Sequence, residues 1–395
     1  MPVTDMGQRF EFLSQAWIDE ARQFVSARGC AADFSLCERF ADPPPGIDGS
    51  WWLRARDGVV EAGPGVLEGA DVQVDGDYQA ILALAQTVYA AGEDAVARAR
   101  RELIHRAGTS AFRVAGQVPP AVAPVLGELH DHLAARTIEN PNLEHRLNRL
   151  GLRRQAEELA ELGYTVIERA ISEAFADEVR GHVQREVLAH DPFTTNGLIR
   201  RHRVFEEIAA HPWVCAVGQS ALSQAMILGA MSGTYKEAGP GKIPLHVDSP
   251  FVHEPFPEWP HVVTACWALE DWTEAAGPTW VIPRSHLQRR RPRKGDGIDG
   301  AVPIEMPKGS VALWRDDVWH WQGDRTAPGA RVAIHASYNR VFVRQLEDMR
   351  LPQEQLKRNG PAFQALMGMD DPFGRSSFTG HDPQRMANAG RQAFR

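Results

Sequence analysis

The stretch YKEAGPGKIPLHVDSP, residues 235–250, contains the feature that decides the fold and the chemistry of this chain. Its HVD tripeptide provides His246 and Asp248, and a further histidine, His320, follows far downstream. Side chains alternate between the two faces of an extended strand, so His246 and Asp248 would lie on one face. Two imidazoles and one carboxylate form a facial triad, which suits non-haem Fe(II) and leaves coordination positions open for other ligands.

An HxD tripeptide also occurs by chance, so the surrounding sequence decides how much weight it carries. Two more segments follow, VVTACWALEDWTEAAGPTWVIPRSH at 262–286 and KGSVALWRDDVWHWQGDRTAPGARVAIHASYNR at 308–340. Their blocks come in a fixed order: HxD, a strand ending in AL-D, a G-x-V-IP-SH block, G-SV, WH, and an arginine that begins the next strand. This order resembles the phytanoyl-CoA dioxygenase family of Fe(II)- and 2-oxoglutarate-dependent oxygenases, over roughly residues 150–374.

The resemblance implies an α+β chain whose C-terminal domain is a double-stranded β-helix, or jelly roll, flanked by helices. It implies that His246, Asp248 and His320 bind Fe(II) and carry the catalysis, with 2-oxoglutarate and O2 as cosubstrates. Arg331 lies where the family holds the distal carboxylate of 2-oxoglutarate, and its planar guanidinium matches a carboxylate in two parallel hydrogen bonds. The alternatives are a histidine packed among tryptophans for His320 and a surface arginine for Arg331.

Further residues near these blocks are expected to complete the site. Trp267 matches an aromatic position of the family close to the cosubstrate, and Ser337 would share the face of Arg331 by its even spacing. Tyr235 and Lys242 flank the first ligand and are expected beside 2-oxoglutarate. The candidates for substrate contact are His253, Arg290 and Trp321.

Two features of the composition bear on the substrate. Seven of the eleven tryptophans fall between Trp259 and Trp321. Packing is the commonest role of such rings, although an aromatic wall beside the iron would favour a bulky apolar substrate. The run QRRRPRK, residues 288–294, is the most basic part of an acidic chain. It predicts either solvated loop charge or capture of a phosphate or carboxylate on the substrate.

The overall composition is that of an ordinary soluble globular protein, with 43% hydrophobic and 24% charged residues. The net charge of −8 argues against a nucleic-acid binder, which would normally carry a basic face. The four cysteines lack CxxC spacing, so neither a zinc site nor a disulfide framework is indicated. No leader and no membrane span of ~20 apolar residues is evident. These observations together predict a location in the reducing cytoplasm.

A length of 395 residues favours two domains. We expect a small α+β domain over residues 1–140 and the dioxygenase domain over 141–395, joined by a linker at Asn140-Pro141-Asn142. The first domain should contain strands at 51–56, 70–74 and 110–116 and helices at 78–90 and 120–135. With GADVQVDGDYQAILALAQ at 69–86, this order resembles a sterol-carrier-protein-2-type lipid-binding domain. A domain that forms a homodimer is the alternative.

The sequence as a whole predicts a dioxygenase that hydroxylates an unactivated C–H bond of a small organic substrate and releases succinate and CO2. Halogenation is disfavoured because Asp248 occupies the coordination position that a halide would need. Two other classes stay open, namely a lipid-binding carrier with a degenerate oxygenase half and a non-oxidative metal-dependent enzyme on a cupin-type barrel. The second of these has no need for Arg331.

Overall fold

The structure is a computed structural model that describes residues 9–91, 112–139, 142–190 and 193–369. The chain divides into two compact units, of which unit 1 contains residues 1–150 and 351–364 and unit 2 contains residues 151–350 and 365–395. This division differs from the expected boundary at residue 140, and the segment 351–364 belongs to the first unit rather than the second. Residues 140–141 of the expected linker lie outside the described residues.

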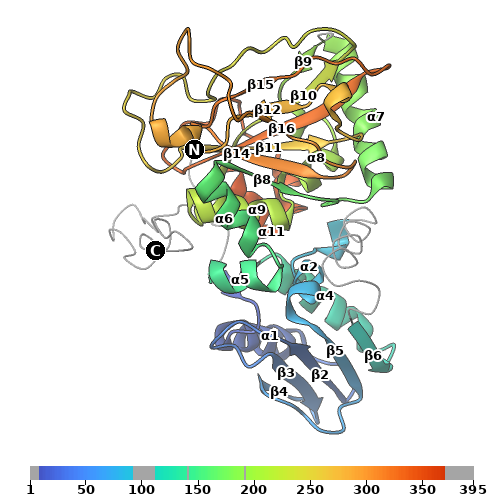
Figure 1. Cartoon of the computed structure of the whole chain (residues 1–395). Helices are drawn as coiled ribbons and strands as arrows, with labels where there is room; N and C mark the ends of the chain where they lie inside the picture. The colour runs from blue at the N-terminus through green and yellow to red at the C-terminus, as the bar shows by residue number, and fades with distance from the viewer. Residues whose placement is uncertain (1–8, 92–111, 140–141, 191–192, 370–395) are drawn as a thin grey trace. The chain divides into compact units, whose positions relative to one another are not determined.

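Unit 1 is a small α+β domain built on a five-stranded sheet with the order β4-β3-β2-β5-β6. The strands are β2 (Phe34–Ala41), β3 (Ser50–Arg56), β4 (Val59–Pro64), β5 (Val72–Asp77) and β6 (Phe112–Gly116). The short strands β1 (Phe10–Glu11) and β7 (Thr137–Ile138) pair with each other. The helices are α1 (Gln15–Arg28), α2 (Tyr78–Ala85), α4 (Ala123–Ala134), α5 (Leu143–Arg149) and α10 (Gln353–Lys357). Both strands expected at 51–56 and 70–74 are present, whereas the helix expected over 78–90 ends at Ala85 (Figure 1).

The core of unit 1 forms where helix α1 packs on the sheet. Trp17, Ile18, Ala21 and Val25 recur at helical spacing and are all buried. The Trp17 ring meets the ring of Trp51 edge-on at 4.9 Å between centroids. Helix α2 contributes its apolar face to this same core cluster. That packing favours a scaffold role for unit 1, and the resemblance to a lipid carrier stays a prediction.

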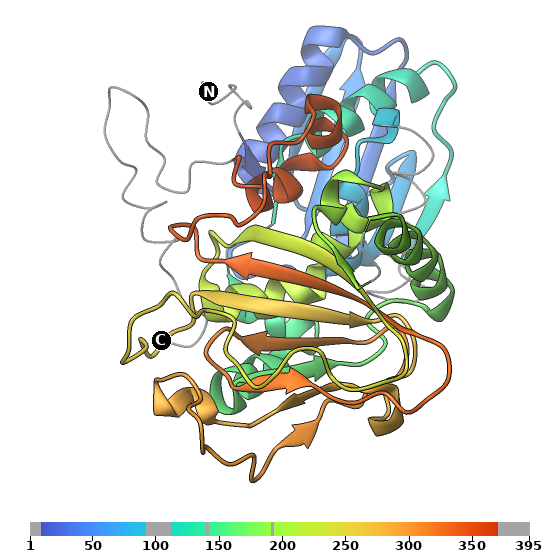
Figure 2. The ribbon, with the colours of Figure 1, turned by 90° about the horizontal axis from the view of Figure 1, so that it is seen from above.

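Unit 2 is built on two antiparallel sheets. The larger has the strand order β8-β14-β11-β16-β10-β9, and the smaller has the order β13-β12-β15. The strands of the larger sheet are β8 (Tyr164–Ile167), β9 (Thr194–Thr195), β10 (Ile227–Lys236), β11 (Val262–Ala268), β14 (Val311–Arg315) and β16 (Arg331–Asn339). Those of the smaller sheet are β12 (Thr279–Val281), β13 (Val302–Pro303) and β15 (His320–Gln322). Figure 2 shows the long strands side by side, although their neighbours in the sheet are distant in sequence.

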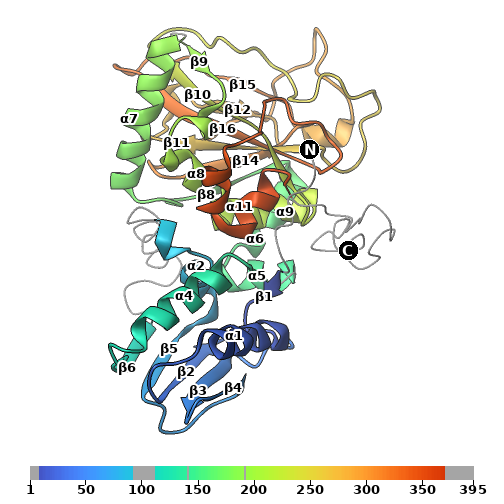
Figure 3. The same ribbon diagram turned by 180° about the vertical axis from the view of Figure 1, so that it is seen from behind.

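The two sheets of unit 2 share one apolar core. Cys266 on β11 and Val281 on β12 belong to the same buried cluster, so the inner faces of the sheets are turned toward each other. The opposite face of the larger sheet is covered by helices, because a Cβ added at Gly233 on β10 would meet Val183 of α7 (Figure 3). These helices are α6 (Arg153–Leu162), α7 (Glu173–His190), α8 (Arg203–Ala209) and α9 (Pro212–Leu222). Unit 2 is therefore a double-stranded β-helix flanked by helices, as expected.

A side chain at the start of helix α7 satisfies one of its free backbone N–H groups. Ser172 accepts a hydrogen bond from the backbone N–H of Phe175 at 3.2 Å, at the start of α7. The division between the two units falls inside α11 (Gly360–Leu366). All four cysteines are free thiols. In the described part of the chain, every helix is too short or too polar to cross a membrane.

We expect Trp17→Ala to destabilise unit 1 by about 3–5 kcal/mol, because a large buried ring is lost. The same change removes the hydrogen bond from its indole N–H to Thr137, which is 2.9 Å long. Urea unfolding of the full chain, followed by circular dichroism, measures the effect. Gln23→Ala, at an exposed position of the same helix, is the matched control and should change stability by less than about 0.5 kcal/mol. Equal midpoints for the two variants would contradict this account of the core.

Candidate metal centre

Three side chains converge between the two sheets of unit 2. Donor atoms of His246, Asp248 and His320 all lie within 4.8 Å of one another. The backbones of the two histidines pair directly, with N–H to O distances of 3.0 and 3.1 Å in the two directions. The Asp248 backbone N–H donates to the carbonyl of Asp316 at 2.9 Å. The loop after β10 is thus joined to the start of β15, which brings these distant residues together.

Both imidazoles are oriented by backbone carbonyls. Nδ1 of His246 lies 2.9 Å from the carbonyl oxygen of Pro244, and Nδ1 of His320 lies 3.0 Å from that of Val318. Since a carbonyl only accepts, each Nδ1 carries the proton in the neutral ring and each Nε2 has a lone pair available for a metal. The Nε2 atoms lie 3.4 Å (His246) and 3.3 Å (His320) from Oδ1 of Asp248.

The two carboxylate oxygens of Asp248 have separate roles. Oδ2 accepts hydrogen bonds from the Thr264 hydroxyl and the Trp314 indole N–H, both at 2.9 Å. Oδ1 is left facing the imidazoles. Burial by itself would raise the pKa of Asp248, but the imidazoles of His320 and His246, when protonated, outweigh it through their charge and hydrogen bonds and hold the pKa well below its usual value. The carboxylate is therefore ionised and has one oxygen directed to a shared metal position.

Arg331 lies on the same inner wall as the triad. It begins β16 and is only 1% exposed, and its side chain points to the same face as Ala333, which belongs to the core between the sheets. Its guanidinium donates to the carbonyl of Gly277 and lies 4.6 Å over the ring of Trp272. Among the described residues, its Nε–H has no hydrogen-bond partner. A buried guanidinium with an unsatisfied donor fits an anionic ligand.

Arg331 makes one end of the inner wall positively charged. Two residues on β10, which were not predicted from the sequence, lie beside it at this cationic end. Lys236 pairs with Arg331 across the sheet and Thr234 pairs with Ala333, so both side chains share the face of Arg331. Lys236 is buried, and its ammonium donates to the carbonyls of Gly323 at 2.6 Å and Pro240 at 3.2 Å. Burial, with a contribution from the charge of Arg331, lowers the pKa of Lys236 to about 8.

The Thr234 hydroxyl and the Trp272 indole N–H, both buried, have no hydrogen-bond partner in the described part of the chain. Together with the Arg331 Nε–H, they give three unsatisfied polar groups near one end of the inner wall. Lys236 itself is a weak sign of this site in the sequence, because a lysine at the end of an otherwise apolar or small-residue strand needs a partner when it is buried. Its partner could be found only from the strand pairing.

The wall between the triad and Arg331 is uncharged. Cys266 on β11 pairs with His335 on β16, and the Cys266 sulfur lies 3.2 Å from Nε2 of His335. Burial raises the pKa of the Cys266 thiol to about 12. Burial, followed by the charge of Arg331, lowers the pKa of His335 to about 4. Both groups are therefore neutral at neutral pH.

Two expected cosubstrate residues lie on the wrong face of the sheet. Trp267 alternates with Cys266 and turns to the helix-covered face, where its ring lies 5.2 Å from that of His211. Tyr235 alternates with Lys236 and shares the face of Gly233, which is covered by α7. Both predictions are wrong for the same reason: one residue of offset in a strand moves a side chain to the other face.

The remaining expected residues are dispersed. Ser337 does share the face of Arg331, but it lies six positions further along the strand, which is roughly 20 Å. Trp321 alternates with His320 and stacks on Trp280 outside the inner wall, with 5.7 Å between ring centroids, so its expected substrate contact is not supported. Lys242 and His253 are both exposed, and their expected roles stay predictions. The Lys242 ammonium lies 4.4 Å over the Phe193 ring.

Arg290 is held by neighbouring groups rather than presented to a substrate. Its guanidinium forms two hydrogen bonds with Asp296, at 2.7 and 3.0 Å, and lies 4.7 Å over the ring of Trp319. Most of the tryptophans in this segment are likewise buried in packing: Trp267, Trp272, Trp314 and Trp319. The aromatic wall beside the iron is therefore mainly core.

The donor set fits Fe(II), because two neutral imidazoles and one monodentate carboxylate are the ligands of the non-haem iron facial triad. His246 is the more open ligand, with 34% of its side chain exposed against 5% for His320, so access is from the side of His246. A double-stranded β-helix with this triad and a buried cationic end defines a non-haem iron, 2-oxoglutarate-dependent type of oxygenase. Residues 155–333 match the family model described as Phytanoyl-CoA dioxygenase (PhyH).

The chain is 25% identical over 204 residues to "Uncharacterized protein Rv1501" of Mycobacterium tuberculosis, covering 47% of this chain and 75% of the relative. A solved structure of HygX from Streptomyces hygroscopicus with nickel and 2-oxoglutarate bound has 16% identity and a TM-score of 0.43, covering 49% of this chain and 89% of that one. EctD from S. alaskensis with bound Fe has 21% identity and a TM-score of 0.41, covering 48% and 76%.

We expect Thr264→Val to weaken Fe(II) binding by about tenfold to a hundredfold, because Asp248 loses one of the donors that fix its orientation. Anaerobic titration of the metal-free protein measures the dissociation constant. Thr165→Val is the matched control, since it removes a buried threonine hydroxyl that donates to Glu158 at 2.6 Å on the same sheet. Equal affinities in the two variants would show that the hydrogen bond to Asp248 does not position the ligand.

Proposed function

We propose that unit 2 is an Fe(II)- and 2-oxoglutarate-dependent dioxygenase that hydroxylates an unactivated C–H bond of a small organic substrate, with release of succinate and CO2. The observation that supports it most is the pairing, on one inner wall, of the His246, Asp248 and His320 triad with the buried guanidinium of Arg331. The bound iron would supply the activation of O2, and the protein would supply binding and orientation.

In this proposal His246, Asp248 and His320 hold the iron. The carbonyls of Pro244 and Val318 keep the proton on each Nδ1, so that both Nε2 atoms are ready to coordinate. Asp248 contributes one oxygen, because its other oxygen is occupied by two hydrogen bonds. The carboxylate also occupies the position that a halide would need, which favours hydroxylation over halogenation.

The distal carboxylate of 2-oxoglutarate would lie against Arg331. Lys236 adds a second positive charge directly across the sheet, and the unsatisfied hydroxyl of Thr234 lies one residue pair further along. Because Cys266 and His335 are neutral, positive charge on this wall is concentrated at one end. A dianion is thereby oriented with one carboxylate at the cations and the other toward the metal.

Two other classes make different demands on these residues. A carrier protein with a degenerate oxygenase half would have no reason to retain three oriented metal ligands. A non-oxidative metal enzyme could use the triad as a Lewis acid site, but would not need a buried, unsatisfied guanidinium. The test of the proposed class is turnover. Anaerobically purified protein, supplied with Fe(II), 2-oxoglutarate and O2, should release succinate, and a screen of small molecules that increase this release would identify the substrate.

We expect one Fe(II) per chain, and we expect His246→Ala and His320→Ala each to lose most of it, since each removes one of three protein ligands. Metal analysis after anaerobic loading and desalting measures the stoichiometry. His335→Ala is the control, because His335 lies on the same wall without contributing to the triad. Stoichiometric iron in both ligand variants would overturn the assignment.

Arg331→Leu should weaken 2-oxoglutarate binding by about tenfold to a hundredfold while iron binding changes little, because a charge-assisted pair is lost at the far end of the cosubstrate. Anaerobic titration of the Fe(II) protein, followed by its metal-to-ligand absorption band, separates the two affinities. An unchanged 2-oxoglutarate dissociation constant would mean that another group binds the distal carboxylate.

Lys236 predicts a pH dependence of 2-oxoglutarate binding. Its pKa is lowered to about 8 by burial and by Arg331, with further charges of Asp324, Lys242 and Arg325 nearby. Below pH 8 the ammonium is charged and attracts the dianion, and above it the proton is lost. The affinity should therefore fall as the pH rises through 8, by up to about tenfold per pH unit.

The dissociation constant of 2-oxoglutarate, measured on either side of pH 8, tests this dependence. Lys236→Met should bind more weakly at low pH and should lose the pH dependence. Lys308→Met, which removes an ammonium paired with Asp177 at the surface, is the control and should keep the wild-type profile. A profile that is unchanged in Lys236→Met would assign the titration to another group.

A further inference from the structure

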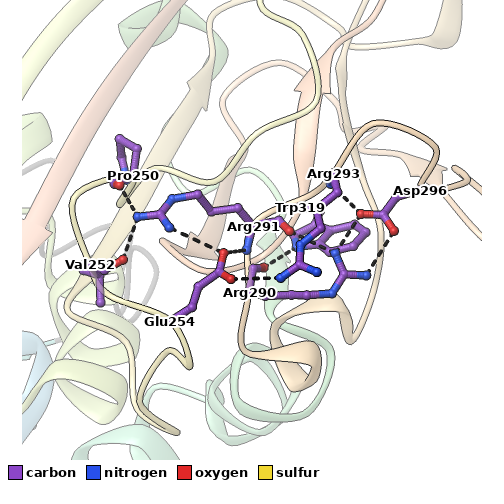
Figure 4. Close-up of polar contacts among 8 residues, drawn as sticks. All are labelled: Pro250, Val252, Glu254, Arg290, Arg291, Arg293, Asp296 and Trp319. Atoms are coloured by element: carbon purple, nitrogen blue, oxygen red, sulfur yellow. Dashed lines mark hydrogen bonds and ion pairs between the residues drawn. The ribbon is translucent and has the colours of Figure 1, made fainter.

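Three arginines of the basic segment 288–294, which follows the G-x-V-IP-SH block, are paired with carboxylates. Arg290 is paired with Asp296, and both Arg291 and Arg293 are paired with Glu254, at 3.4 and 3.3 Å (Figure 4). This pairing lowers the pKa of both carboxylates. The backbone N–H of Arg291 and the guanidinium of Arg293 lower the pKa of Glu254. These arginines are therefore engaged with the protein, which argues against the expected capture of a phosphate or carboxylate on the substrate.

Arg291 also binds the backbone of the loop that follows the metal ligand Asp248. Its guanidinium donates to the carbonyl of Pro250 and, at 2.7 Å, to the carbonyl of Val252. Its backbone N–H donates to the Glu254 carboxylate at 2.8 Å. One residue thus fixes this loop at three points within a few residues of Asp248, as Figure 4 shows. The planar fork of a guanidinium can serve several acceptors in this way, whereas a lysine ammonium is a point charge.

The same basic segment also contacts the residue that precedes the third triad residue, His320. Trp319, which directly precedes His320, donates its indole N–H to the carbonyl of Arg290 at 2.9 Å. The Arg290 guanidinium lies over the ring of Trp319. Phe256, at the end of the loop, donates its N–H to the carbonyl of Arg289 at 2.7 Å. Residues 289–291 therefore connect the chain after Asp248 with the chain before His320.

We propose that Arg291, held by Glu254, is a positioning residue of the metal centre: it fixes the loop 250–254 and thereby holds Asp248 in place for the metal. This inference rests on the proposed function, because it takes Asp248 as a metal ligand. Exposed ion pairs contribute little to global stability, and the side chain of Arg291 is 36% exposed. The effect of Arg291 falls on metal affinity rather than on the stability of the fold.

The test uses the full chain and Co(II), whose absorption spectrum reports its coordination. Arg291→Met should weaken Co(II) binding by about tenfold or more and alter the spectrum. The reason is that the loop after the metal ligand Asp248 loses the hydrogen bonds that it receives from the guanidinium. The thermal midpoint of the metal-free protein should stay near that of the wild type. Arg291→Lys keeps the charge but lacks the planar fork. Its affinity for Co(II) should lie between those of the wild type and Arg291→Met.

Arg293→Met is the matched control. It removes the same charge from the same carboxylate, but in the described structure the Arg293 side chain, 68% exposed, donates to Glu254 and to neither loop carbonyl. It should bind Co(II) within about twofold of the wild type, since exposed ion pairs are weak. An equal loss of Co(II) affinity in Arg291→Met and Arg293→Met would show that Arg291 acts only through its charge. That result would overturn the proposal.

Wild-type affinity and spectrum in Arg291→Met would also overturn the proposal. If that variant does not fold, Arg291→Lys decides in its place, and an unchanged dissociation constant there counts against the positioning role. Failure of the proposed function is a separate outcome, because it would appear as wild-type protein that binds no metal through the triad. No substrate or cosubstrate is needed for any of these measurements.

Discussion

The hydrogen bonds that hold the Asp248 carboxylate are the constraint on which the rest of unit 2 depends. One oxygen of this carboxylate is bound by Thr264 on β11 and by Trp314 on β14, while the other faces the two imidazoles. An ionised carboxylate in a buried place is costly unless its oxygens are satisfied. The two strands must therefore lie side by side, and the loop carrying Asp248 must cross their inner face.

A second constraint follows from the pairing of the triad histidines. The reciprocal backbone hydrogen bonds between His246 and His320 join a loop next to the larger sheet with a strand of the smaller one. The metal position is therefore located between the sheets rather than at an edge. Arg331 and Lys236 lie toward the other end of the same wall, with the neutral pair Cys266 and His335 between. This separation of charge gives the wall a direction, which suits a dianion that binds end-on.

How far the site could be predicted depended on the kind of information that each residue carries. His246, Asp248, His320 and Arg331 were predicted because their types and order are unusual enough to identify a family pattern, and the structure brings the first three together. The predictions for Trp267 and Tyr235 were wrong because nearness in sequence does not say which face a strand residue occupies. In the fold, the two-sheet unit and the strands at 51–56 and 70–74 were predicted, whereas the return of residues 351–364 to unit 1 was not.

The sequence alone determined the ligand types and their order along the chain, and, through the resemblance to a family, the double-stranded β-helix, because these depend on which residues occur and in which order. Only the tertiary structure decided that Lys236 stands opposite Arg331 and that the Arg291 fork binds the loop after Asp248. The physical reason is that strand register and side-chain contacts join residues that are distant in the chain. Such pairings are set by the burial of whole sheets, and no local signal in the sequence records them.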